Sequence, residues 1–194
     1  MTFLQIEHAV YAMGSSGWWY GLFIFAVYAI WVILAARMLK SDDQLRMFEK
    51  FWGGLLVALW IGKHIHLAQE GLWNIMDNLE LHLCGFSRFL SIFLLLFGWR
   101  WAYYPLFFWG IVGGFHSLLT PELTSGDTPF MYAEYYIVHG GIIIIPLYFV
   151  FARGWMIGKW TWAKVLGINV LLMAPVGLIN YLVDANYMFL CQRP

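Results

Sequence analysis

Long apolar stretches alternate with short polar ones along the whole chain. Four stretches contain no Asp, Glu, Lys or Arg: 9–36, 101–121, 135–152 and 165–183. Two more, 51–72 and 81–99, are apolar apart from a few charged residues embedded in them. An α-helix needs about 20 mostly apolar residues to cross the hydrocarbon core of a membrane. The pattern therefore predicts six transmembrane helices, near 17–36, 51–71, 81–98, 102–119, 134–152 and 164–183.

The composition agrees with this pattern. Of the 194 residues, 62% are hydrophobic and 11% are charged, whereas a soluble domain carries about 25% charged residues. No internal repeat or linker divides the chain. We therefore expect an all-α fold, a polytopic membrane helical bundle in which residues 1–194 form a single six-helix transmembrane domain.

Lys and Arg residues outside the predicted helices alternate from loop to loop. With Lys164 at the very start of the sixth helix counted in the fifth loop, eight of the nine lie in the first, third and fifth loops, and only Arg193 belongs to the opposite side. The positive-inside rule then predicts that the odd loops are cytoplasmic and that both termini are outside. We therefore expect a multi-pass membrane protein. A net charge of zero argues against nucleic acid as a partner.

Polar residues inside the predicted helices gather toward the outer end of each helix. Charged groups in hydrocarbon cost several kcal/mol, so they persist where they line a polar cavity, pair with one another or take part in chemistry. Helical spacing places Glu80, Cys84, Arg88 and Ser91 on one face of the third helix. The other polar residues expected around this pocket are Lys63, His66, Glu70, His116, Glu134, His139, Asn180 and Asp184.

Small residues form a face on the fourth predicted helix. Gly110, Gly113, Gly114 and Ser117 recur at intervals that bring them to one side. Small side chains let a neighbouring helix approach closely. We expect these glycines to serve packing rather than to bind phosphate.

Cys84 is the candidate nucleophile of the predicted pocket. A free cysteine is often only a small buried hydrophobic residue, and a disulfide with Cys191 is a further alternative. Arg88, one turn away on the same face, favours the reactive thiolate. His116 and His139 are candidate general bases, although either could be a core histidine that hydrogen-bonds to a backbone carbonyl.

Arg88 and Lys63 admit two interpretations. They could pair with Glu70, Glu80 or Asp184, which is the usual condition for buried charges. They could also hold an anionic headgroup, because a guanidinium matches phosphate geometry. The spacing of the histidines fits no metal motif, so we expect neither a metal ion nor a cofactor.

Four segments carry a resemblance to a known family: Leu81-His82-Leu83-Cys84, Leu119-Thr120-Pro121-Glu122-Leu123, His139-Gly140 and the ending Asn186-Tyr187-Met188-Phe189-Leu190-Cys191-Gln192-Arg193-Pro194. In their order and spacing the chain resembles the bacterial YwaF-type integral membrane proteins, which are related to eukaryotic transmembrane protein 164. The resemblance implies a six-helix fold related to small lipid-cleaving membrane enzymes, and phospholipid acyl transfer through a cysteine acyl-enzyme. It matches Cys84 to the nucleophile and His139 to the base, and it includes Asn186 and Tyr187 without a role.

Three functions remain open from the sequence. The first is a lipid acyltransferase or hydrolase, in which Cys84 attacks an acyl carbonyl, His139 or His116 takes its proton, and Arg88 or Lys63 holds the phosphate. The second is a non-catalytic protein that binds or transports a lipid or an ion in the same pocket. The third, metal or haem binding, would use His64, His66, His116 and His139. Membrane lipid is the expected substrate or ligand, and the oligomeric state stays open. The expected lining also includes His66, Glu70, Asn180, Asp184, Asn186 and Tyr187.

Overall fold

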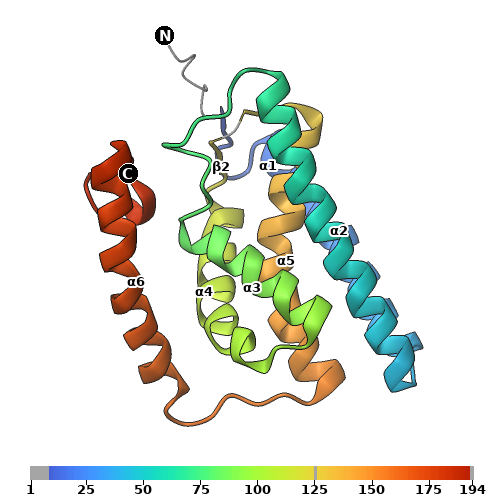
Figure 1. Ribbon diagram of the computed structural model, residues 1–194. Helices are drawn as coiled ribbons and strands as arrows, with labels where there is room; N and C mark the ends of the chain where they lie inside the picture. The colour runs from blue at the N-terminus through green and yellow to red at the C-terminus, as the bar shows by residue number, and fades with distance from the viewer. Residues whose placement is uncertain (1–8, 125, 193–194) are drawn as a thin grey trace.

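The computed structural model describes residues 9–124 and 126–192, and Figure 1 shows the chain as a bundle of helices. The all-α prediction is confirmed, because each of the six expected helices occurs close to its predicted range. The helices are α1 (Ser16–Met38), α2 (Asp42–Gln69), α3 (Leu83–Phe97), α4 (Arg100–Leu119), α5 (Pro129–Arg153) and α6 (Thr161–Val183).

Helix α2 begins nine residues before its predicted start. Ser41 caps this end: its hydroxyl accepts a hydrogen bond from the Gln44 backbone N–H, and the Gln44 side chain accepts one from the Ser41 N–H. Such a reciprocal capping box satisfies two backbone donors that the helix leaves unpaired. The apolar run that guided the prediction starts only at Phe51, so the first turns of the helix were missed.

Within residues 9–124 and 126–192, three helices are long and apolar enough to cross a membrane: α1, α5 and α6. Helix α3 is apolar but has only 15 residues, which makes it about 22 Å long and shorter than the hydrocarbon core of about 30 Å. The outward faces of α1 and α6 carry large exposed apolar side chains such as Phe23, Leu171 and Tyr181. These features are those of an integral membrane protein.

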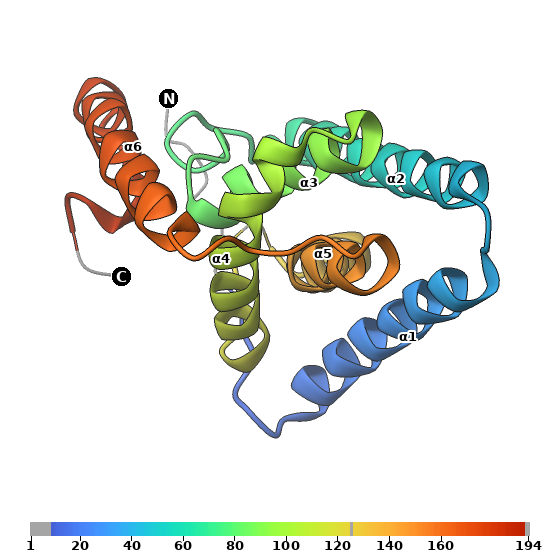
Figure 2. The same ribbon diagram turned by 90° about the horizontal axis from the view of Figure 1, so that it is seen from below.

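Helix α5 is the central element of the bundle. It contacts α1, α3 and α4, while α2 packs mainly on α3. Figure 2 shows that α6 stands to one side of the other helices, beside α4. A short 3₁₀ helix, η1 (Tyr187–Phe189), folds back onto α6. The helix ends near Glu80, Pro129 and Val183 are called the polar end below, and those near Arg46, Arg100 and Lys164 the basic end.

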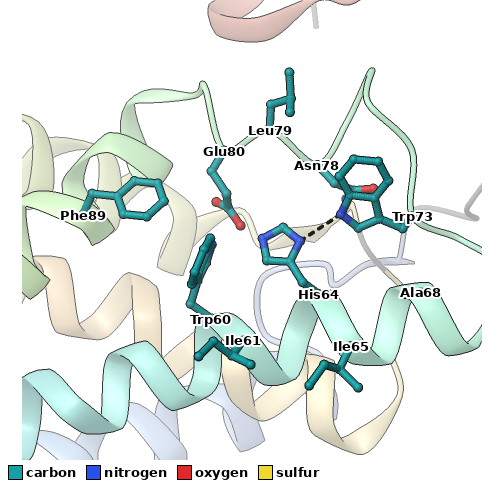
Figure 3. A pocket seen from close by; sticks show the side chains of 10 residues that line it. All are labelled: Trp60, Ile61, His64, Ile65, Ala68, Trp73, Asn78, Leu79, Glu80 and Phe89. Carbon is teal, nitrogen blue, oxygen red and sulfur yellow. Dashed lines mark hydrogen bonds between the residues drawn. The ribbon is translucent and has the colours of Figure 1, made fainter.

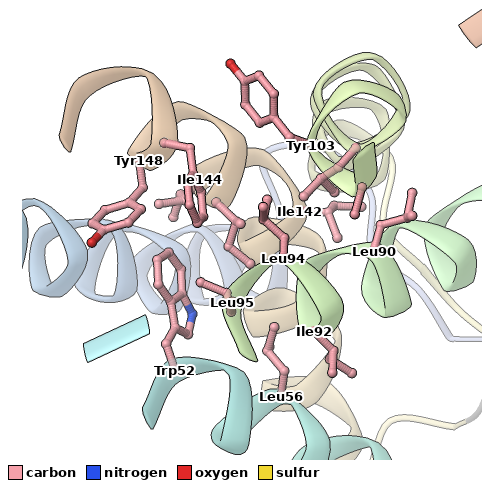
Figure 4. Close-up of a cluster of buried hydrophobic side chains, with 14 of the residues drawn as sticks. Trp52, Leu56, Leu90, Ile92, Leu94, Leu95, Tyr103, Ile142, Ile144 and Tyr148 are labelled. Atoms are coloured by element: carbon pink, nitrogen blue, oxygen red, sulfur yellow. The ribbon is translucent and has the colours of Figure 1, made fainter. Parts of the chain in front are cut away.

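The largest buried cluster lies where α2, α3, α4 and α5 meet. Side chains from all four helices interlock there, and most of them are fully buried (Figure 4). Within a membrane, burial from lipid gives little hydrophobic driving force, so helix association depends on close van der Waals packing. The cluster includes Trp52, Leu56, Leu94, Leu95, Tyr103, Leu106, Ile142 and Tyr148.

Glycines allow α4 to approach α5 very closely, as the sequence predicted. A Cβ at Gly110 would lie 2.3 Å from the Ile142 carbonyl oxygen, and one at Gly114 would lie 2.7 Å from the His139 carbonyl oxygen. No side chain fits at such distances without displacing backbone. The packing role expected for these residues is confirmed, and it fixes α5 against α4 at the depth of His139.

Two short strands, which the sequence did not predict, join the N-terminal segment to the α4–α5 loop. Strand β1 (Ala9–Val10) pairs antiparallel with β2 (Glu122–Leu123). The Tyr11 N–H also donates to the Pro121 carbonyl at 3.1 Å. Strands of two residues carry no period-2 pattern that a sequence reading could detect.

Candidate functional site

Four charged side chains from four segments form a buried ion network at the polar end. Lys63 of α2 donates from Nζ to Glu80 Oε1 at 2.8 Å, and Arg88 of α3 donates from Nη1 to the same oxygen at 3.2 Å. Arg88 Nη2 also donates to Glu134 Oε1 of α5 at 2.6 Å. Two cations thus face two carboxylates, and this pairing compensates charges that would otherwise be costly to bury.

Glu80 is the shared acceptor of the network and lies in the loop before α3, not inside the helix as predicted. Burial alone would raise its pKa, but Arg88 and Lys63 outweigh that effect and hold the pKa at about 2. Its backbone has a left-handed φ of 57°, which costs on the order of 1–3 kcal/mol for a residue other than glycine. The carbonyl oxygen of Glu80 would lie 2.1 Å from a Cβ at Gly85. Gly85 therefore lets the loop fold tightly over the first turn of α3.

Cys84 lies half-buried between α3 and α4. Its Sγ is 4.0 Å from Ser117 Oγ, and it would lie 3.5 Å from a Cβ at Gly113. The Ser117 hydroxyl donates its only proton to the Gly113 carbonyl at 2.9 Å, so the Cys84 thiol is the donor toward Ser117. The thiol is therefore oriented by α4.

His139 is fixed in one tautomer by its own helix. Its Nδ1 donates to the Tyr135 carbonyl at 2.9 Å, because a carbonyl oxygen can only accept. In the neutral imidazole the lone pair then lies on Nε2. The His139 ring also packs on the Tyr135 ring with centroids 4.1 Å apart. Tyr135 in turn donates from its hydroxyl to the Ser117 carbonyl at 3.0 Å, so a chain of contacts joins His139 to the neighbour of Cys84.

A pocket of about 520 Å³ opens beside Glu80, between α2, the α2–α3 loop and α3. Figure 3 shows the His64 ring facing the Glu80 carboxylate across this pocket. Trp73 Nε1 donates to His64 Nδ1 at 2.9 Å, so Nε2 carries the proton. Neither His64 Nε2 nor Trp60 Nε1 has a hydrogen-bond partner among the residues that the structure describes. Two buried N–H donors beside the pocket are thus left without an acceptor in the described part of the chain, a feature that the sequence reading missed.

Four residues expected in the pocket lie away from the ion network. His66 Nε2 pairs with Thr128 Oγ1 at 3.2 Å, and His116 is exposed on α4. Glu70 is exposed at the C-terminal end of α2, and Asp184 is exposed at the end of α6. Within the described part of the chain, none of them forms an ion pair with Lys63 or Arg88. Of the three carboxylates expected to pair with these cations, only Glu80 does so in the described structure. The second carboxylate of the network, Glu134, was not expected as a partner.

Asn180 and Tyr187 fasten the C-terminal segment to the loop that carries Glu80. The Asn180 side chain exchanges two hydrogen bonds of 2.9 Å with the Tyr187 backbone. The Tyr187 hydroxyl donates to the Ile75 carbonyl at 2.7 Å and accepts from the Leu79 N–H at 2.9 Å. Both side chains are buried. They position the α2–α3 loop, which the sequence could not indicate because the contacts join residues far apart in the chain.

Asn186 and His82 complete this C-terminal fastening. Asn186 Oδ1 accepts from the backbone N–H groups of Cys191 and Gln192 at 3.1 and 3.0 Å. His82 Nδ1 accepts from the Met188 N–H at 3.3 Å, and burial lowers the pKa of His82. These contacts give the closing sequence motif a structural role.

The expectation of a possible disulfide is corrected by the structure. Cys84 is a free thiol inside the bundle, and Cys191 is a free thiol that is exposed. Among residues 9–124 and 126–192, no group of three or more His, Cys, Asp and Glu side chains could hold a metal ion.

A second buried charge cluster lies at the basic end and was not predicted. Glu49 is 1% exposed and accepts hydrogen bonds from Arg153 Nε at 2.6 Å, Arg46 Nη1 at 3.1 Å and the Tyr148 hydroxyl at 3.2 Å. Arg46 also donates to the Leu95 carbonyl at 2.8 Å, which satisfies the C-terminal end of α3. The sequence reading had explained the two arginines by topology alone.

Nearly the whole chain matches a known protein family. The model of a family described as the TMEM164 family matches residues 6–194. No curated protein and no solved structure matches the chain. The matched range includes all six helices and the residues around Cys84 and His139.

Proposed function

This chain belongs to the TMEM164 family, and we propose that it is a membrane-embedded enzyme that transfers or hydrolyses an acyl chain of a membrane lipid. Cys84 is the nucleophile and His139 is the base. The observation that carries this proposal is the fixed tautomer of His139, whose Nδ1 donates to the Tyr135 carbonyl. The Nε2 lone pair then remains on a histidine that is linked through Tyr135 and Ser117 to the half-buried thiol of Cys84.

The first half of the reaction forms a thioester. His139 Nε2 takes the proton of the Cys84 thiol, and the sulfur attacks the carbonyl carbon of a lipid ester. The tetrahedral intermediate collapses, the ester C–O bond breaks, and the protonated His139 gives its proton to the departing alkoxide. The products of this step are an acylated Cys84 and a lipid alcohol.

The second half releases the acyl chain. A lipid alcohol, or water in the case of hydrolysis, attacks the thioester carbonyl while His139 accepts its proton. The C–S bond breaks, and the Cys84 thiolate takes the proton back from His139. No metal or redox group is needed for either half, because protons and electron pairs balance between the two residues and the substrates.

The ion network has a positioning role in this proposal. Lys63 and Arg88 are each engaged with a carboxylate, so capture of a phosphate by them would require competition with Glu80 and Glu134. The pocket beside Glu80 is lined by His64 and Trp60, whose buried N–H groups have no acceptor among the described residues. We assign the oxygen atoms of the lipid headgroup or glycerol to these two donors.

The membrane arrangement in this proposal has six spans with both termini outside. The excess of Lys and Arg at the basic end supports a cytoplasmic position for that end. The short α3 then holds Cys84 within the outer half of the membrane. The motifs near Cys84, His139 and Asn186 support assignment to the bacterial YwaF-type branch, and hence to the bacterial cytoplasmic membrane.

The test uses the full-length protein purified and reconstituted in phospholipid vesicles. We expect transfer of a labelled acyl chain between lipids, or its release as fatty acid, and a hydroxylamine-sensitive acyl adduct on Cys84 by mass spectrometry. Cys84→Ser and His139→Ala should each lower the rate at least a hundredfold. Cys191→Ser is the matched control and should keep the wild-type rate.

Two results would reject the enzyme assignment. One is an unchanged rate in folded Cys84→Ser protein. The other is ion or lipid flux across the vesicle membrane without any acyl turnover, which would favour the binding or transport alternative.

A further inference from the structure

An apolar groove runs between α3, α4 and α6, apart from the candidate site. It has a volume of about 670 Å³, within the range of sites that hold small molecules. Aromatic side chains from α3 and α4 form one wall, and aliphatic side chains of α6 form the other. The lining includes Phe86, Phe93, Trp109, Val165, Ile168 and Leu172.

The groove begins at the basic end of the bundle. Thr161 and Lys164, in the first turn of α6, line it there together with Trp101 and Tyr104 of α4. Leu172 lies eleven residues beyond Thr161, so the lining extends about 16 Å along α6. The groove is therefore long and narrow, with polar groups at one end and only apolar groups at the other.

The groove and Cys84 lie on opposite faces of α3. Phe86 and Phe93 follow Cys84 by two and nine residues, and both positions point about half a turn away from it at 100° per residue. Cys84 faces Ser117 and Gly113 of α4. A ligand of the groove would thus not contact the thiol, and the groove is a second site.

The basic end of the groove carries a cation without a carboxylate partner among the described residues. Lys164 is exposed and forms none of the ion pairs in the described part of the chain. Arg100 begins α4 and directly precedes Trp101, which lines the groove. Its guanidinium lies 5.1 Å from the centre of the Trp155 ring. Basic pockets between membrane helices bind anionic lipid headgroups. A Lys near an anionic membrane surface strengthens binding about fivefold.

The surroundings favour a lipid as the occupant. Helix α6 is largely unburied along its length, so the groove opens to the side, where a membrane supplies acyl chains. The polar groups at its mouth match a headgroup, and the apolar lining matches a chain. We propose that the groove binds an anionic phospholipid, with one acyl chain between α3, α4 and α6 and its phosphate paired with Lys164.

Native mass spectrometry of the full-length protein in detergent tests this proposal. The probes are dioleoyl phosphatidylglycerol, which is anionic, and dioleoyl phosphatidylcholine, which has no net charge. We expect phosphatidylglycerol to bind at least fivefold more tightly, and Lys164→Gln to remove about that factor. Lys159→Gln is the matched control, because this lysine lies outside the groove lining, against the Trp160 ring, and its removal should leave the preference unchanged.

A second variant tests the position of the chain. Ile168→Trp fills the groove from α6 and should weaken the binding of both lipids without changing the elution of the protein in size-exclusion chromatography. Equal binding of the two lipids by the wild type would overturn the proposal. So would an unchanged preference in Lys164→Gln, or full binding by Ile168→Trp.

Discussion

Arg88 Nη2 donates to Glu134 Oε1 at 2.6 Å across the interface between α3 and α5, and both side chains are about 95% buried. Each partner loses its hydration when the bundle forms, and only a short, well-aligned ion pair offsets that cost. Removing one partner leaves the other charge buried and uncompensated. The pair therefore stabilises the contact between α3 and α5 at the candidate site.

Arg88→Met should destabilise the protein by about 3–5 kcal/mol. The substitution leaves Glu134 without its cation, and it leaves Glu80 with Lys63 alone. Thermal unfolding in detergent, followed by tryptophan fluorescence, measures the effect. Glu70→Gln is the control, because Glu70 is exposed at the end of α2 and its substitution should change the midpoint little. Equal midpoints for Arg88→Met and the wild type would show that the pair does not stabilise the fold.

Acid should weaken the fold through Glu80. The pKa of this carboxyl is about 2 in the folded protein, below its usual value of 4.5. A group with a lowered folded pKa contributes stability above its unfolded pKa, and that contribution disappears as the pH falls from about 4.5 to about 2. On the order of 3 kcal/mol should be lost over this window.

The comparison that isolates this effect is with Glu80→Gln. The variant should be less stable than the wild type at pH 7, and the difference between the two should shrink steadily toward pH 2. Unfolding midpoints measured in one detergent at pH 7, 4.5 and 3 give the result. A difference that stays constant over this range would mean that Glu80 is not held ionised by Arg88 and Lys63.

The sequence predicted the helices and the polar face of α3 better than it predicted the residues that pair with that face. Runs of apolar residues locate a helix, and a 3.6-residue period places Cys84 and Arg88 on one face. Periodicity does not say which helix lies opposite that face. Glu134 was therefore missed as the partner of Arg88, and the left-handed conformation of Glu80, outside α3, has no sequence signal.

The same reason explains the residues whose structural roles were not foreseen. Asn180 was noticed as a polar residue in an apolar helix and Tyr187 as part of the closing motif. The Tyr187 hydroxyl, however, bonds to the α2–α3 loop, more than 100 residues away in the chain. Glu49 lies beyond the apolar run by which the second helix was recognised. Charge patterns fix the orientation of helices more readily than they reveal a buried pair such as Glu49 and Arg153.

Tyr187→Phe should loosen the loop that carries Glu80. The substitution removes the hydroxyl that joins Ile75 to Leu79. It leaves one partly buried carbonyl and one partly buried N–H unpaired, at a cost of about 1 kcal/mol. Amide hydrogen exchange should become faster in residues 72–80 than elsewhere. Tyr181→Phe is the control, because Tyr181 is 84% exposed. Unchanged exchange in the loop would remove the role assigned to the C-terminal segment.

The two cysteines should differ sharply in their reaction with a water-soluble maleimide. Cys191 is exposed and Cys84 is half-buried between α3 and α4, so the first should be labelled much faster in the folded protein. Mass mapping after short labelling should find the adduct on Cys191, and Cys191→Ser protein should remain largely unlabelled until it is unfolded. Rapid labelling of Cys84 by this hydrophilic reagent would contradict its enclosed position.

Gly114→Ala should disturb the candidate site through the backbone of α5. Its new Cβ would lie 2.7 Å from the His139 carbonyl oxygen, so α4 and α5 must separate, and overpacking of this kind costs about 1–3 kcal/mol. Gly167→Ala on α6 is the matched control, because nothing lies within 4 Å of its Cβ position. Alanine is the better helix former by about 1 kcal/mol, so this variant should be as stable as the wild type or slightly more stable. Unfolding midpoints and acyl-transfer rates together check the prediction. Gly114→Ala should lower both, and Gly167→Ala should lower neither. Equal behaviour of the two variants would mean that the close approach of α4 to α5 does not position His139.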